Sequence, residues 1–301
     1  MNQNEIVIRH LNKFYGKKRA LCDVDLTIGQ GMFGLLGRNG AGKTTLMKTL
    51  ATLLHKNTGD IFICGIPVEH AREVRSITGY LPQEFSCYPG MTVWEALDYL
   101  GVLSGMDSKA RKERIELLLQ KVNLTEHRHK KVKALSGGMK RRLGIAQALL
   151  PDPKVLIVDE PTAGLDPEER IRFRNLLCEV AEERIVLLST HIVGDIEATC
   201  ENIAILNEGK LLFTGDINKL LHEALGKVFE ADISREELAA VKKEHIVTAM
   251  HASGKNCRVR ILAESPPLPS AVPAEPNVED AYMLCLLHHG VAANDLGGAK
   301  E

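Results

Sequence analysis

The stretch "GLLGRNGAGKTTLMKTL", from Gly34 to Leu50, decides the fold. It begins as an apolar strand and ends with the spacing of a helix that starts near Lys43, and Gly37, Gly40 and Gly42 stand in the turn between the two. The pattern matches G-x-x-x-x-G-K-[ST]. Glycines let backbone amides converge on a polyphosphate, and the helix N-terminus adds its dipole. The stretch therefore predicts a phosphate-binding turn.

The residue types in this turn predict how a nucleotide is held. Lys43 can reach the β- and γ-phosphate oxygens, and the Thr44 hydroxyl can bind Mg²⁺. A turn that contains Gly-Lys-Thr by chance is the alternative, and the strand before it and the helix after it argue against that. We expect nucleotide contacts from Gly37, Arg38, Asn39, Gly40, Ala41, Gly42, Lys43, Thr44 and Thr45.

A pair of acids follows a second apolar run, "KVLIVDEP". Four strand residues bring Asp159 to the carboxyl edge of a sheet, where ligands of open α/β folds bind. We expect Asp159 to hold Mg²⁺ through water. Glu160 beside it would repel that carboxylate, yet it suits a base that polarises an attacking water. A solvated acid pair at a strand end is the alternative. The run "RIVLLSTH" follows after one helix, and this spacing predicts a βαβ unit in a buried parallel sheet.

Bulk properties bound the class of protein. With 301 residues the chain predicts one large and one smaller domain. The net charge of −1 indicates no broad basic face, so we expect no nucleic-acid partner. The seven scattered cysteines predict reduced thiols in a cytosol. We find no signal-peptide pattern and no apolar run near the roughly 18 residues of a spanning helix, so any membrane role must come from a partner.

The pattern of the sequence changes along the chain. Short strands broken by turns occupy the first eighty residues, and helical spacing appears from about Thr92 to Val122. From residue 221 to 301 alternating runs and a helix capped by Asn277 predict a small α+β domain. The proline-rich "SPPLPSAVPAEP" within it is interpreted as a flexible tether. Residues 291–301 are expected to be disordered.

A second glycine cluster, "LSGGM", follows the helical segment. Ser136 is a good N-cap for a helix from Met139 to Leu149, and a cap that presents free amides is also an anion site. One small polar residue would suffice for a cap. The paired Gly137 and Gly138 therefore suggest close approach by something anionic.

Between "GRNGAGKTT" and "VLIVDEPTAGLD", this cluster resembles the signature loop of ABC-type ATPases. The resemblance covers about Ile6 to Leu220 and implies an α/β P-loop NTPase (RecA-like) core, with an antiparallel β subdomain and a helical signature subdomain at about 85–150. It implies an ATPase domain at 1–220 that uses ATP and Mg²⁺. It also implies a head-to-tail pair, in which one subunit closes on the ATP of the other through its signature loop, Leu135, Ser136, Gly137, Gly138 and Met139.

The resemblance also assigns roles to four single residues. Tyr15 is similar to the aromatic that stacks on adenine, with a core aromatic as the alternative, and Gln83 to the glutamine that touches Mg²⁺ and water. Asp166 in "AGLDP" resembles the acidic residue of the loop with which two subunits contact each other. His191 resembles the histidine at the γ-phosphate, with a structural role as the alternative. The implied catalytic set is Glu160, His191 and Gln83, and the implied metal set is Thr44, Gln83 and Asp159.

The implied function is the energising subunit of a membrane transporter whose permease is a separate chain. The segments "GMTVWEALDYLGVLSGM" and "EPNVEDAYMLCLL" most resemble the exporter branch that includes daunorubicin-resistance ATPases. Phe85, Tyr88, Met91 and Trp94 fall where the family's groove receives a permease helix, with plain core packing as an equal alternative.

The remaining expectations concern assembly and place. We expect a homodimer or heterodimer at the cytoplasmic face of a plasma membrane, in a bacterium, with a C-terminal domain that is regulatory or dimer-stabilising. A soluble ABC protein acting on ribosomes or DNA is the alternative. A P-loop kinase or other phosphotransferase is a second one.

Overall fold

The computed structural model describes residues 4–291, and the chain divides into two compact units. The first is Met1–Glu201 with Leu206–Leu211, and the second is Asn202–Ile205 with Leu212–Glu301. The boundary expected at residue 220 falls inside a helix of the second unit, α8 (Ile217–Glu223). Apart from residue 291, the tail expected to be disordered lies outside the described residues.

An antiparallel sheet forms one layer of the first unit. Its strands lie in the order β2 (Lys18–Ile28), β1 (Ile6–Tyr15), β4 (Thr58–Ile63) and β5 (Ile66–Pro67). Ile6 of β1 lies opposite Ile28 of β2 and Ile63 of β4, and all three side chains are fully buried. Burial of one face of this sheet thus fixes the register of its strands.

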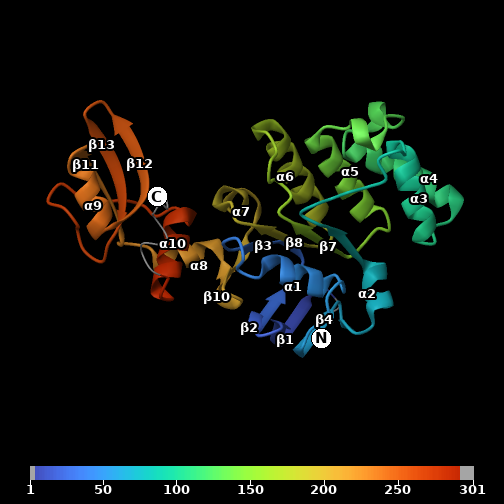
Figure 1. Cartoon of the computed structure of the whole chain (residues 1–301), viewed down its shortest axis with the longest axis horizontal. Helices are drawn as coiled ribbons and strands as arrows, with labels where there is room; N and C mark the ends of the chain where they lie inside the picture. The colour runs from blue at the N-terminus through green and yellow to red at the C-terminus, as the bar shows by residue number, and fades with distance from the viewer. Residues whose placement is uncertain (1–3, 292–301) are drawn as a thin grey trace. The chain divides into compact units, whose positions relative to one another are not determined.

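Parallel strands form the second layer, in the order β3 (Gly31–Leu36), β8 (Ile185–Thr190), β7 (Val155–Asp159) and β6 (Thr78–Leu81). Every residue of β7 and β8 is buried, as expected for strands covered on both faces. The helix α1 (Lys43–Leu50) lies against β2 and β7, between the two layers (Figure 1). The predicted βαβ unit is confirmed, because α6 (Pro167–Ala181) connects the parallel neighbours β7 and β8.

Three further helices lie against the strands of the first unit. The helices α6 and α7 (Val193–Thr199) lie against β3 and β8, and α2 (Ala71–Ile77) lies against β5 and β6.

Among residues 4–291, no helix is both long and apolar enough to cross a bilayer. All seven cysteines fall within the described residues and are free thiols.

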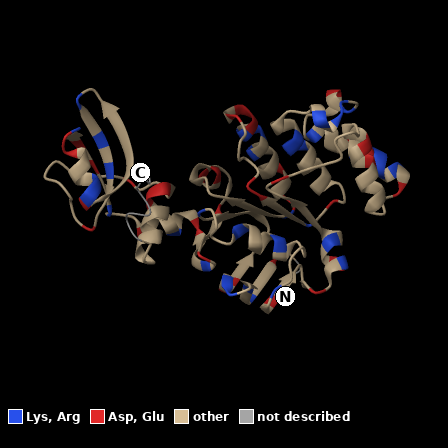
Figure 2. Cartoon of the chain, viewed as in Figure 1, with Lys and Arg blue, Asp and Glu red and all other residues tan. Residues whose placement is uncertain are grey.

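Three helices form the helical part of the first unit: α3 (Val93–Leu103), α4 (Ser108–Lys121) and α5 (Gly137–Leu149). Each begins at a polar cap, because Thr92, Asp107 and Ser136 accept hydrogen bonds from the first-turn amides. The three helices contact one another, and α5 also lies against β6. Both signs of charge occur along α4 and α6, and the acids Glu168 and Glu169 stand at the start of α6 (Figure 2).

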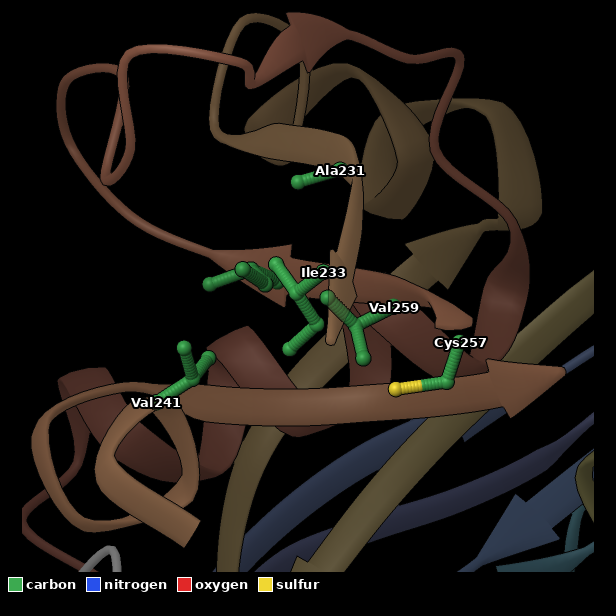
Figure 3. Close-up of a cluster of buried hydrophobic side chains, with 6 residues drawn as sticks. Ala231, Ile233, Val241, Cys257 and Val259 are labelled. Carbon is green, nitrogen blue, oxygen red and sulfur yellow. The ribbon is translucent and has the colours of Figure 1, made fainter. Parts of the chain in front are cut away.

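The second unit is α+β, as its sequence pattern predicts. Its sheet has the order β12 (Ile246–Ser253), β13 (Asn256–Leu262), β11 (Val228–Ser234) and β14 (Val272–Pro273), accompanied by α8, α9 (Leu238–Glu244) and α10 (Val278–His288). The strands β9 (Asn202–Asn207) and β10 (Lys210–Asp216) precede it. Ile233 of β11 and Val259 of β13 point toward Val241 of α9 and form the centre of a buried cluster (Figure 3).

The interpretation of residues 265–276 as a flexible tether is wrong. Val272 and Pro273 form strand β14, which pairs with Phe229 and Glu230 of β11. Leu268 and Ala271 pack against the buried cluster. Proline is tolerated because β14 is an edge strand, where a missing N–H leaves no ladder bond unmade. The segment is therefore part of the domain and does not link two parts.

A buried carboxylate joins α10 to the sheet of the second unit. Asp280 is fully buried and accepts hydrogen bonds from Thr248 Oγ1 (2.6 Å), Arg260 Nε (2.8 Å) and the Asn277 amide (3.0 Å). Asn277 caps α10 in return, which confirms the predicted cap. Arg260 also contacts Glu230 of β11, at 2.7 Å. These contacts tie β11, β12 and β13 to α10. Removal of Arg260 would leave the buried Asp280 carboxylate without its counter-charge.

We predict that Gly79→Ala destabilises the first unit. A Cβ at Gly79 of β6 would collide with the Ala148 carbonyl oxygen of α5, and overpacking of this kind costs about 1–3 kcal/mol. Denaturant unfolding should show an earlier midpoint. Gly194→Ala in α7 is the matched control, because its Cβ would meet nothing within 4 Å. Equal midpoints for the two variants would contradict the close approach of α5 to β6.

Candidate active site

A cavity of about 870 Å³ lies where β3 ends and α1 begins. Gly42 caps α1 with a φ of 109°, and a Cβ there would lie 2.8 Å from the Ala20 carbonyl oxygen. Only glycine therefore fits this position without strain. The cavity is lined by Tyr15, Lys18, Arg19, Ala20, Arg38, Asn39, Gly40, Ala41, Gly42, Lys43, Thr44, Thr45, Gln83, Glu160, Asn207, Glu208 and Gly209.

Lys43 is the buried cation of the cavity. Its Nζ donates to the Gly37 carbonyl (2.7 Å) and the Arg38 carbonyl (3.2 Å) and lies 3.1 Å from Glu160 Oε1. The Lys43 side chain is 5% exposed and that of Glu160 is 7% exposed. Phosphate oxygens that bind Lys43 would therefore compete with the Glu160 carboxylate for the same ammonium group.

Glu160 is held in a conformation that L-residues rarely adopt. Its φ is 46°, and its amide donates to the Ser189 carbonyl (3.1 Å) and the Ser189 hydroxyl (3.2 Å). Its second carboxylate oxygen lies 2.8 Å from His191 Nδ1. A strained backbone persists only where its surroundings impose it, and it is typical of functional sites. The carboxylate is thus fixed between Lys43 and His191.

Asp159 has one oxygen satisfied and one not. Oδ1 accepts a hydrogen bond from Ser189 Oγ at 2.5 Å, whereas Oδ2 is buried without a hydrogen-bond partner among the described residues. A buried carboxylate oxygen left unpaired is costly unless another group binds it. Together with the half-buried Thr44 on the cavity wall, this donor set fits Mg²⁺, which prefers oxygen ligands and retains water.

Tyr15 and Gln83 both line the cavity. Tyr15 ends β1 and is 48% exposed, so the alternative of a core aromatic is wrong. Lys13 Nζ lies 5.4 Å from the centroid of its ring. An exposed ring at a cavity edge is available for stacking on a planar base. Gln83 is exposed in the segment that follows β6.

The signature loop, Leu135–Met139, is placed away from this cavity. Ser136 caps α5 by accepting from the Met139 amide at 3.2 Å, and Ser136 and Gly137 are exposed. Asp166 caps α6 by accepting from the Glu169 amide at 2.9 Å. Among the described residues that line the cavity, none belongs to the signature loop and none is Asp166.

Ser189 is a site residue that the sequence reasoning missed. The parallel pairing of β7 with β8 puts it directly opposite Asp159, and it contacts both acids. Another missed residue is Asp195 of α7, fully buried, which accepts from Thr162 Oγ1 (2.5 Å) and Arg170 Nε (2.6 Å). Both sets of contacts depend on strand register and helix packing, which no local sequence pattern reveals.

The fold and the site define a P-loop ATPase. The family described as ABC transporter matches residues 21–163. An ABC transporter ATP-binding protein of Bacillus subtilis is 36% identical over 81% of each chain, and the Nod factor export ATP-binding protein I of Burkholderia lata is 37% identical over 79% of this chain and 81% of that protein. CbiO1 of Clostridium perfringens, part of a transporter complex, has a TM-score of 0.67 at 27% identity, over 72% of this chain and 90% of its own.

The chain therefore belongs to the family of ABC transporter ATP-binding proteins. It is an ATP-hydrolysing subunit with the α/β P-loop NTPase fold that the sequence predicts.

We predict that Ser189→Ala weakens both metal binding and hydrolysis. The change removes the donor to Asp159 and one acceptor from the Glu160 amide. Loss of such a supporting contact typically lowers metal affinity or activity about 10–100-fold. ATPase rate should be measured against Mg²⁺ concentration. Ser104→Ala serves as the control, because within residues 4–291 the Ser104 hydroxyl bonds the Leu100 carbonyl of α3 and no other group. An unchanged half-saturating Mg²⁺ concentration in Ser189→Ala would contradict the assignment.

Proposed function

We propose that the chain powers a separate transmembrane permease as one member of a head-to-tail pair that closes on ATP. The observation that carries this proposal is the separation described above: the cavity contains one phosphate-binding turn, and the signature loop lies outside it. In such a pair each signature loop faces the nucleotide of the partner. ATP binding then holds the two chains together, and hydrolysis releases them.

Within each site, Glu160 is the base that polarises the attacking water. Its carboxylate is nearly fully buried and contacts Lys43 through one oxygen and His191 through the other. His191 is not among the described residues that line the cavity, but its side chain is 40% exposed and contacts Glu160, which does line it. Backbone amides from Gly37 to Thr45 hold the polyphosphate.

Thr44, Gln83 and, through water, Asp159 would hold Mg²⁺. Gln83 and Thr44 line the cavity, and Asp159 contributes its unpaired Oδ2. Bound Mg²⁺ would neutralise charge on the phosphate oxygens. Tyr15, which lines the same cavity, stacks on the adenine.

The signature loop offers an anion site at the start of a 13-residue helix, α5. The amides of the first turn point along the dipole, and Gly137 and Gly138 present no side chain to an approaching phosphate. Asp166, at the start of α6, contacts the partner chain in the same closed pair. Its side chain fixes the loop after Glu160 by capping the helix.

The helical part supports docking to a permease. Tyr88 (45% exposed) packs edge-to-face against Tyr99 (38% exposed), with ring centroids 5.1 Å apart. Val102 and Leu103 of α3 are 52% and 64% exposed. Apolar groups exposed together commonly mark a contact surface. By contrast, Trp94 stacks with Arg128 of its own chain, at 5.6 Å.

Direction and place are inferred from the relatives. Similarity to the Nod factor export protein supports export as the direction of transport. The residues that contact the cargo would lie mainly in the permease. We infer attachment to the cytoplasmic face of a bacterial plasma membrane, in a homodimer or heterodimer. The C-terminal domain, predicted at 221–301, would stabilise or regulate the pair.

We predict that Glu160→Gln binds ATP, hydrolyses it very slowly and accumulates as a dimer, because removal of the base leaves the phosphate-binding turn and the signature loop intact. Light scattering after gel filtration, with and without ATP, measures the mass. Glu113→Gln on the exposed face of α4 is the control and should hydrolyse normally. A Glu160→Gln chain that stays monomeric with ATP at micromolar concentration would overturn the head-to-tail pair.

We also predict that tagged Glu160→Gln, purified with ATP from gently solubilised native membranes, retains a multi-span membrane protein in stoichiometric amount. Mass spectrometry of the bound fraction identifies that protein. Recovery of ribosomal or DNA-repair proteins in its place would favour the soluble alternative. Transfer of the γ-phosphate to a molecule other than water would favour a phosphotransferase.

A further inference from the structure

We propose that Arg141 is a positioning residue that joins the helix of the signature loop to Gln83, so that contact with the partner's nucleotide sets the geometry of the chain's own site. Arg141 lies on α5, one turn after the paired glycines. Its Nη1 donates to the Pro82 carbonyl oxygen at 3.0 Å, and Pro82 directly precedes Gln83. The link from Arg141 to Gln83 concerns hydrolysis within one chain. The coupling to the partner's nucleotide rests on the proposed head-to-tail pair.

The contact between α5 and the Gln83 segment is tight on both sides of Gln83. A Cβ at Gly144, one turn after Arg141, would lie 2.6 Å from Leu81 Cδ1 and 3.0 Å from the Phe85 ring. The same helix approaches β6 closely where Gly79 meets the Ala148 carbonyl. The segment from Leu81 to Phe85 therefore cannot keep its position if α5 shifts, because close-packed contacts do not deform continuously.

Arg141 is a costly choice for a bond to one carbonyl. The side chain is partly buried, and its guanidinium makes no ion pair within 4.0 Å among the described residues. Burial lowers the pKa of Arg141, and the nearby Asp159 carboxylate opposes this effect. The guanidinium thus donates to the Pro82 carbonyl and is also attracted by the charge of Asp159. A neutral donor would satisfy the carbonyl at a lower desolvation cost, so the charge and reach of arginine suggest a further role.

The arrangement links two nucleotides. The signature loop begins α5 and, in the proposed pair, binds the partner's ATP. Arg141, on the next turn of α5, fixes the backbone that carries Gln83, which faces the chain's own cavity. A shift of α5 on engagement with the partner would move Pro82 and change the position of the Gln83 amide. Each site would then reach full activity only when the other is closed.

The test is a double-mutant cycle between Arg141 and Gln83. Arg141→Ala should lower kcat about ten-fold, with KM for ATP changed less than about two-fold, because Arg141 does not touch the nucleotide. Gln83→Ala should lower kcat by at least as much. The double variant should be no slower than Gln83→Ala alone, since Arg141 acts through Gln83. Arg141→Lys, which keeps a charged donor, should recover part of the rate.

Arg184→Ala is the matched control. Arg184 Nη1 also donates to a proline carbonyl, that of Pro153, at 3.0 Å, but it lies at the opposite end of the parallel strands. Its effect on kcat should multiply with that of Gln83→Ala. Multiplicative losses for Arg141→Ala and Gln83→Ala would show a general structural effect and would overturn the proposal. If Arg141→Ala fails to fold, the same cycle with Arg141→Lys decides the question.

The outcome also separates this proposal from the proposed function. Non-additive losses together with a Glu160→Gln variant that never dimerises would retain the link from Arg141 to Gln83 within one chain. That pair of results would reject only the proposed coupling between the two chains. Additive losses together with normal dimerisation would leave the head-to-tail pair in place and reject Arg141 as its internal link.

Discussion

The site depends on the parallel register of β7 and β8. That register places Ser189 opposite Asp159, so that one serine can bind the carboxylate of Asp159 and the amide of Glu160. A shift by one residue would turn every side chain of β8 to the other face of the sheet. His191 follows the end of β8 and meets Glu160 only because the two strands end together. The buried apolar residues of both strands hold this register, so core packing and chemistry are one constraint.

The first unit shows which parts of a site local sequence can predict. The phosphate-binding turn, the helix after it and the caps of α5 and α10 were all predictable, because each depends on residues within a few positions. Ser189 and Arg141 could not be predicted. Their partners lie in other elements, 30 and 59 residues away along the chain, and only the folded sheet brings them together. Local patterns thus indicate which elements form, and register decides what those elements hold.

The second unit illustrates the same limit in a domain without a recognisable motif. Alternating apolar residues were enough to predict strands, and Asn277 was enough to predict where α10 begins. The prediction of a tether at the proline-rich segment was wrong, because composition does not show that Leu268 and Ala271 pack against a buried cluster. The bond from Arg260 to Asp280 was equally hidden, since an arginine in an alternating strand reads as an exposed residue. Its role follows from its contact with Asp280, which is fully buried in the first turn of α10.

The contact between Lys43 and Glu160 has a consequence for the timing of the reaction. Both groups are nearly excluded from solvent, and each neutralises the other. A polyphosphate that arrives at Lys43 brings several negative charges to a site where one carboxylate already has the ammonium group. Phosphate that displaced Glu160 from Lys43 would release the carboxylate that we propose as the base. Lys43 would in this way impose an order on the reaction, because the nucleotide must bind before the Glu160 carboxylate is released to act.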